Sequence, residues 1–257
     1  MRLIRSCVLS LSMFTKLPMP KVKWEPENMR YVLCFLPLAG ALMGGALFGW
    51  ERLCTWLRLG SLIRAAGFTL LPVLLSGGIH LDGFLDVSDA LGSHAEPEKK
   101  REILKDSHVG AFAVVACCCW FLAMFAFCTE VEVANGAVWR MALIPVLSRT
   151  MGALCALLYP AYGETGLLSS FRENAPKVGG AVALGLVFLA AAGAMVYLDR
   201  IPGAVTVLAG LAVAAVLYPI AKKQLQGMSG DLAGWYITVS ELIMLMALVI
   251  SEKAVLL

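Results

Sequence analysis

Seven stretches of about twenty mostly apolar residues recur along the chain and restrict its fold, because each is long enough for a helix to cross a bilayer. Of the 257 residues, 60% are hydrophobic and 15% are charged. This balance excludes a disordered chain, and a net charge of +3 does not favour a nucleic-acid partner. We therefore predict an all-α, polytopic membrane helical bundle that forms one domain over residues 1–257. The predicted spans are 31–50, 61–79, 109–128, 137–159, 179–198, 202–220 and 233–250.

Basic residues in the short connections predict the orientation of these spans. With a cytoplasmic N-terminus, 14 of the 21 Lys and Arg residues fall in segments on the cytoplasmic side and four in segments outside. We therefore predict a multi-pass protein of the cytoplasmic (inner) membrane with a cytoplasmic N-terminus. The four cytoplasmic segments are 1–30, 80–108, 160–178 and 221–232.

The N-terminal segment, residues 1–30, needs a separate interpretation. It opens with two arginines and a short apolar run, as a signal peptide does, but residues 16–20, KLPMP, offer no small-residue cleavage site. We expect a retained helix that lies in the membrane interface. In the first span, four glycines favour close packing against another helix. These are Gly40, Gly44, Gly45 and Gly49.

Most of the titratable chemistry falls in one predicted cytoplasmic loop, residues 80–108. It holds all three histidines and four of the six aspartates of the chain. Asp82, Asp86 and Asp89 follow the spacing i, i+4, i+7, which places them on one face of a helix. Like charges at this spacing destabilise a helix unless a cation compensates them, and carboxylates with phosphate oxygens suit Mg²⁺. A solvated acidic helix face is the alternative.

Other polar residues face the same side of the predicted bundle. Asp106 and Ser107 precede the third span, where they either cap the helix or belong to an anion site. Asp231 opens the last span and either caps it or supplies a further ligand. Immediately before Asp106, the charged run 98–105 is typical of a solvated helix.

Two charges fall inside predicted spans. Arg149 and Glu241 each lie about ten residues from a cytoplasmic helix end, near the middle of the membrane. Such charges cost about 3 kcal/mol each and are either paired or functional. The sequence leaves open whether they form an ion pair or line a polar cavity that binds substrate.

Five motifs in order along the chain resemble those of the cobalamin synthase family, the adenosylcobinamide-GDP ribazoletransferases. Residues 78–89, GIHLDGFLDVSD, look like the family signature G-[LI]-H-L-D-G-x-x-D-x-x-D. The other segments are similar to F-T-R-L-P-x-P, K-D-S-R-x-G, G-R and T-G-D-x-x-G. They are 14–20 (FTKLPMP), 105–110 (KDSHVG), 148–149 (SR) and 230–234 (GDLAG).

The resemblance implies an activity, substrates and a cofactor. A member of this family joins adenosylcobinamide-GDP to α-ribazole or α-ribazole 5′-phosphate and releases GMP, in late cobalamin biosynthesis. It is an integral membrane enzyme that depends on Mg²⁺, with its active site facing the cytoplasm. The oligomeric state stays open, a homo-oligomer included.

Within that reaction, the site residues receive expected roles. Asp82, Asp86 and Asp231 are the expected metal ligands, and Asp89 is the expected general base with His80 as its rival. The expected substrate-binding residues are Lys105, Asp106, Ser107, Arg149 and Glu241.

Two departures and two rival functions accompany the resemblance. His108 stands where the family has Arg, and Tyr162 where a basic residue is common, which weakens phosphate contacts at both places. Another Mg²⁺-dependent membrane transferase acting on a diphosphate is one rival, but the motif of CDP-alcohol phosphotransferases and the second aspartate pair of aromatic prenyltransferases are both absent. An ion-coupled transporter is the other rival.

Overall fold

The structure is a computed structural model that describes residues 2–106, 108–131, 136–161 and 167–255. Over these residues it contains helices and no strand, apart from an isolated bridge between Ala161 and Met228. The predicted all-α class is therefore confirmed. The short elements are α1 (Arg2–Phe14), α2 (Pro26–Met29), η1 (Leu33–Phe35), α5 (Ile79–Gly92), α6 (Pro97–Ile103), α9 (Leu167–Asn174) and η3 (Ile220–Gln224).

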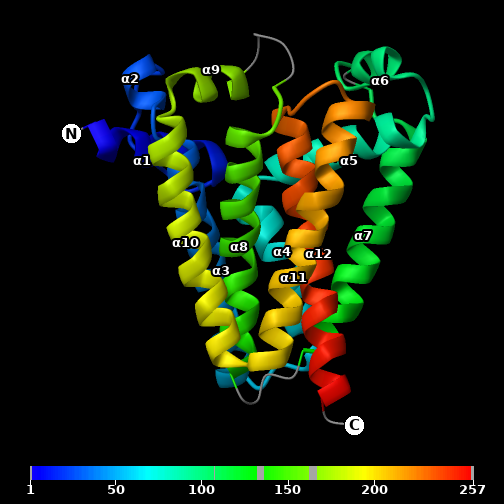
Figure 1. Cartoon of the computed structure of the whole chain (residues 1–257). Coiled ribbons are helices and arrows are strands. Elements are labelled where there is room, and N and C mark those ends of the chain that lie inside the picture. The colour runs from blue at the N-terminus through cyan, green and yellow to red at the C-terminus, as the bar shows by residue number, and fades with distance from the viewer. Residues whose placement is uncertain (1, 107, 132–135, 162–166, 256–257) are drawn as a thin grey trace.

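The long helices stand side by side as a bundle (Figure 1). Six helical segments are long and apolar enough to cross a membrane, and a bent pair makes up to seven. This agrees with the polytopic bundle predicted from the sequence. The long helices are α3 (Leu36–Trp56), α4 (Ser61–Ser76), α7 (Ala111–Thr129), α8 (Ala137–Leu158), α10 (Lys177–Leu198), α11 (Arg200–Pro219) and α12 (Gly230–Val255).

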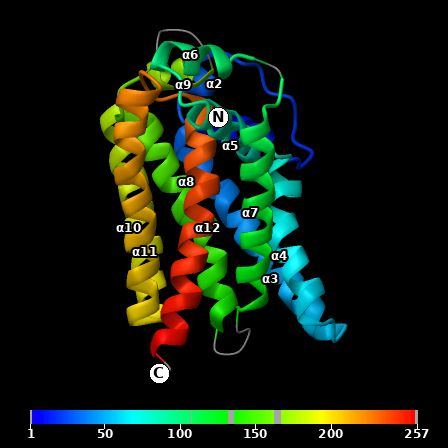
Figure 2. The same ribbon diagram turned by 90° about the vertical axis from the view of Figure 1, so that its right-hand side faces the viewer.

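The span predicted at 61–79 differs from the others. Its helix α4 ends at Ser76, and α5 continues after a bend of 94°. Gly77 and Gly78 form the bend with φ angles of +65° and +79°, which glycine adopts without the steric cost of a side chain. Helix α5 therefore runs across one end of the bundle, against the first turns of α12 and the start of α7 (Figures 1 and 2).

The short helices gather at that same end, and the C-terminus lies at the other (Figure 1). Helices α1, α2, α5, α6 and α9 belong to the segments predicted to be cytoplasmic. Helix α1, predicted to be interfacial, lies across this end and buries Leu9, Leu11 and Phe14 in the core. Its contact with lipid stays a prediction.

Helices α3 and α8 pack through two of the four glycines singled out in the first span. A Cβ atom at Gly40 would overlap the carbonyl of Pro145, and one at Gly44 would overlap the carbonyl of Ala142. Gly45, in contrast, has open space where its side chain would be. The packing prediction is therefore confirmed for one face of the helix, and Gly49 also faces open space.

We predict that Gly44→Ala destabilises the bundle and that Gly45→Ala does not. Overpacking a close contact costs about 1–3 kcal/mol, whereas alanine in place of an unencumbered helical glycine is neutral or favourable. Thermal unfolding of both variants in detergent, followed by circular dichroism, measures the difference. Equal melting temperatures would contradict the α3–α8 contact.

Candidate functional site

Helices α5 and α12 cross in direct backbone contact at one end of the bundle. A Cβ atom at Gly83 of α5 would lie 2.6 Å from the carbonyl oxygen of Asp231, and one at Gly234 of α12 would lie 3.0 Å from that of His80. The hydroxyl of Thr238 donates to the same His80 carbonyl at 3.1 Å. The crossing therefore brings the aspartates of two distant motifs to one place.

A large cavity opens beside this crossing, with a volume of about 610 Å³. Its walls come from α1, α5, α6, α8, α9 and α12, and we call it the main cavity. Four of the residues predicted for the site line it, together with two arginines that the sequence analysis did not single out. These residues are His80, Asp82, Lys105 and Asp231, with Arg101 and Arg172.

A second cavity of about 570 Å³ lies next to the main cavity, and we call it the side cavity. It is bounded by the end of α1 and by the turn between α4 and α5. The two cavities share Met13, Ile79 and Asp82. The remaining residues that line the side cavity are Ser12, Thr15, Lys16, Ser76, Gly77, Gly78, Leu81 and Leu85.

The three aspartates of α5 form a strongly acidic strip. Asp82 is exposed, whereas Asp86 and Asp89 are half-buried. Burial, with the negative charges of Asp82, Asp231 and Asp89, raises the pKa of Asp86 to about 6. Among the described residues, no three His, Cys, Asp or Glu side chains are close enough to hold a metal alone. The strip suits a cation that takes one or two carboxylates and completes its shell with phosphate and water.

Asp89 lies at the start of α7, where its carboxylate accepts a hydrogen bond from the backbone N–H of Ala113 at 3.4 Å. Of the two roles left open for Asp106, the structure does not show the helix cap, because its carboxylate accepts from the backbone N–H of His108 at 3.0 Å. A side chain from another helix satisfies the donor that a local residue was expected to satisfy. Ser107, the other predicted cap, lies outside the described residues.

His80 is the candidate base that lines the main cavity. Its ring is buried and stacks on Phe14 with 5.8 Å between centroids, and its Nε2 atom has no hydrogen-bond partner among the described residues. Burial, with a smaller effect from the charge of Arg149, lowers the pKa of His80 well below its ordinary value. The imidazole is therefore held neutral, with its Nε2 atom unpartnered, and burial makes it a weaker base than a solvated histidine.

Asp231 lies in the first turn of α12, half-buried at the main cavity. The sequence left open whether it caps this helix. The hydroxyl of Ser229 takes the cap position, because it accepts from the backbone N–H of Leu232 at 3.2 Å. The carboxylate of Asp231 is therefore not needed as the cap.

Helix α6 is docked on the connection that leads into α12, so its predicted solvated face is wrong for two residues. Lys100 is buried and donates to the side chain of Gln224 at 2.5 Å. Arg101 is buried as well and donates to the carbonyls of Leu225 and Gly227. Backbone carbonyls outside regular helices need donors, and Arg101 supplies two of them, whereas Lys100 pairs with a side-chain amide.

Arg172 of α9 is the other cation that the sequence analysis missed at the main cavity. Its guanidinium donates to the carbonyl of Tyr159 at 2.8 Å. The sequence carries no local signal for it, because a lone arginine in a short polar segment is typical of a solvated loop. Only the docking of α9 over the end of the bundle brings it to the cavity (Figure 1).

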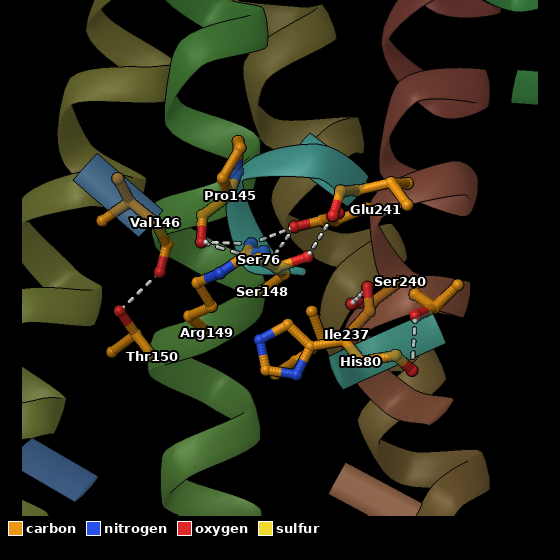
Figure 3. A network of polar contacts seen from close by, with 12 residues as sticks. Ser76, His80, Pro145, Val146, Ser148, Arg149, Thr150, Ile237, Ser240 and Glu241 are labelled. Atoms are coloured by element: carbon orange, nitrogen blue, oxygen red, sulfur yellow. Dashed lines mark hydrogen bonds and ion pairs between the residues drawn. The ribbon is translucent and has the colours of Figure 1, made fainter. Parts of the chain in front are cut away.

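The two charges inside the spans form a buried ion pair (Figure 3). The guanidinium of Arg149 contacts the carboxylate of Glu241, which also accepts from the hydroxyl of Ser148 at 2.8 Å. Neither charged side chain lines the main cavity; both border a void of about 20 Å³ next to His80. Their predicted contact with substrate is untested, and Asp106 likewise lies outside both cavity linings.

A model of the cobalamin-5-phosphate synthase family matches residues 6–249. The chain belongs to that family. Proteins named adenosylcobinamide-GDP ribazoletransferase resemble it over most of its length. The protein from Lachnoclostridium phytofermentans is 32% identical, covering 99% of this chain and 97% of its own. That from Geobacillus thermodenitrificans is 34% identical, covering 88% of each. No solved structure matches.

Family membership confirms the resemblance drawn from residues 78–89 and the neighbouring motifs. The structure also argues against the ion-coupled transporter. The mid-membrane charges of Arg149 and Glu241, which suggested it, neutralise each other as an ion pair. Two glycines of the family motifs have a structural role: α5 and α12 touch through Gly83 and Gly234.

We predict that Glu241→Gln destabilises the protein strongly. Removing one partner of a buried ion pair leaves an uncompensated charge and costs about 3–5 kcal/mol. The matched control is Glu130→Gln, which breaks the exposed pair with Lys253, because an exposed pair contributes about 0–1 kcal/mol. Thermal unfolding in detergent compares the two variants, and equal losses of stability would contradict the structural role of the buried pair.

Proposed function

We propose that this chain transfers the adenosylcobinamide-phosphate group of adenosylcobinamide-GDP to α-ribazole, or to α-ribazole 5′-phosphate, with release of GMP. The observation that carries the proposal is the convergence of Asp82 and Asp231, from two family motifs, on a cavity that three cations also line. The names of the relatives give the substrates. Carboxylates beside cations suit a reaction in which a diphosphate is bound and cleaved.

The reaction is a substitution at phosphorus. A ribose hydroxyl of the acceptor attacks the phosphorus linked to cobinamide, and a new P–O bond forms. The bond from that phosphorus to the bridging oxygen breaks, and the oxygen leaves with GMP. The proton of the attacking hydroxyl passes to a base. Negative charge builds on the phosphate oxygens, so positioning and nearby positive charge dominate the rate.

The cations of the main cavity are suited to the diphosphate. Lys105, which follows α6, and Arg172 of α9 line it together with Asp82 of α5 and Asp231 of α12. Arg101 is held by backbone carbonyls of the connection before α12. It therefore adds positive charge at a fixed place, which stabilises developing negative charge without reorganisation.

His80 is the residue we propose as the general base. It lines the main cavity, and its buried ring is neutral and has an unpartnered Nε2 atom. Asp89 is the alternative, but its carboxylate faces the start of α7 and lines neither cavity. Asp82 lines both cavities, where its carboxylate can accept a hydrogen bond from the attacking hydroxyl and orient it.

Mg²⁺ is the cofactor we propose for this site. The acidic strip of α5 fits it, because it gathers hard oxygen donors, and the raised pKa of Asp86 reflects burial first and repulsion between these carboxylates second. Asp82, Asp86 and Asp231 are the candidate ligands, of which one or two would hold the ion directly while phosphate and water complete its shell. When bound, it would neutralise phosphate charge that the three cations leave uncompensated.

We also propose that the site faces the cytoplasm from the inner membrane. The four segments rich in Lys and Arg belong to the end of the bundle where both cavities open, which agrees with the distribution of positive charge in membrane proteins.

We predict that Asp82→Asn lowers transfer about 100-fold or more, the scale of losing one electrostatic contact to developing charge. The measurement is GMP release and product mass from adenosylcobinamide-GDP and α-ribazole over a range of Mg²⁺ concentrations. Asp199→Asn is the control, since that aspartate lies near Arg140 of α8 and lines neither cavity. An Asp82 variant with the wild-type rate and Mg²⁺ dependence would contradict its role, and wild-type protein without transfer would contradict the function.

We predict that His80→Asn lowers kcat about 100-fold or more with a small change in KM, as removal of a general base does. Asp89→Ala should instead lower the melting temperature, because loss of a side-chain acceptor at a helix start costs about 1 kcal/mol. Kinetics and thermal unfolding of both variants test this division. A stable Asp89 variant with the larger loss of kcat would reverse the assignment.

A further inference from the structure

The side cavity has no role in the function proposed above, although its wall includes Lys16 of the FTKLPMP segment, residues 14–20. We infer that it binds the acceptor as a nucleoside 5′-phosphate, with the phosphate at Lys16 and the ribose hydroxyl directed to Asp82. This inference rests on the proposed function, because that reaction needs an acceptor beside the donor.

Lys16 is fixed against the turn that begins α5. Its backbone N–H donates to the carbonyl of Leu75 at 2.7 Å. Its aliphatic chain lies over Gly77, where any Cβ atom would overlap it, and Gly77 also has a positive φ of +65°. The positive φ favours glycine at residue 77, and the absence of a Cβ atom leaves room for the Lys16 chain in this position.

The charge of Lys16 has no acidic partner within the described part of the chain. It is the basic residue among those that line the side cavity, and it does not line the main cavity. Lys16 is exposed at the cavity wall, where its ammonium can donate to an anionic group of a ligand. The backbone at Gly78 lines the same cavity and adds the first N–H groups of α5, which no side chain caps.

The shape and the other walls of the side cavity suit a nucleoside. Its volume of about 570 Å³ falls in the range of small-molecule sites. Met13 and Leu85 give it apolar surface for an aromatic base, and Asp82 gives it a carboxylate for a sugar hydroxyl. A nucleoside phosphate carries these three chemical parts.

The charges of the two cavities assign the donor and the acceptor. Three cations line the main cavity, which matches a diphosphate, whereas one cation lines the side cavity, which matches a phosphomonoester. Asp82 is the acidic residue common to both linings. Direct transfer requires the attacking hydroxyl of the acceptor to reach the phosphorus of the donor. The two cavities adjoin at Asp82, so we place the reacting atoms there.

The experiment compares the KM values of three substrates in wild-type protein and in Lys16→Met, which keeps the aliphatic contact with Gly77. The substrates are α-ribazole 5′-phosphate, α-ribazole and adenosylcobinamide-GDP. We expect the variant to raise KM for the phosphorylated acceptor about tenfold or more, as loss of one charge-assisted hydrogen bond does. KM for the other two substrates should stay unchanged. Lys21→Met, an exposed lysine outside both cavities, is the matched control.

A second variant tests the cavity apart from the charge. Leu85→Trp narrows the side cavity and does not touch the main one, so it should raise KM for both acceptors and leave KM for the donor unchanged. A selective rise in KM for adenosylcobinamide-GDP in either variant would overturn the assignment. Unchanged KM values in both variants would overturn it as well.

The outcome for the proposed function is read separately, from transfer by the wild-type protein. Should the wild type transfer nothing, the proposed function fails, and calorimetric binding of α-ribazole 5′-phosphate then decides the inference. Binding that Lys16→Met weakens would support the side-cavity site, and binding that it leaves unchanged, or no binding, would overturn it.

Discussion

The backbone contact between α5 and α12 determines where the chemistry of this protein lies. Gly83 touches the backbone of Asp231, and Gly234 touches that of His80, so the two helices approach as closely as their main chains permit. Because side chains project away from such a contact, Asp82 and Asp231 both face the main cavity. A larger residue at either glycine would separate the two aspartates and the walls they belong to.

The turn at Gly77 and Gly78 makes this crossing available. A straight continuation of α4 would carry the aspartates along a membrane span, where each charge is costly. The 94° bend instead lays α5 across the end of the bundle, among the short helices. The same bend forms one wall of the side cavity, facing α1. One local conformation therefore determines the position of both the acidic strip and the side cavity.

The few charges elsewhere serve the architecture around this end. Arg149 and Glu241 neutralise each other between α8 and α12, which makes a mid-membrane pair affordable. Lys100 and Arg101 dock α6 on the connection before α12 and so fix the approach to Asp231. From the sequence, Lys100 and Arg101 were expected to be solvated, because no local pattern distinguishes a cation bound to a distant acceptor from one in water.

The sequence by itself determined the helical membrane class, six of the spans, the family and the acidic strip, because hydrophobic length and helical spacing are local properties of the chain. Tertiary structure alone decided which charged groups share a cavity. It brought Arg172 to the site, gave Asp89 rather than Asp106 to the start of α7, and placed Lys16 on Gly77. Each is a contact between segments far apart in the chain, and nothing in either segment specifies its partner.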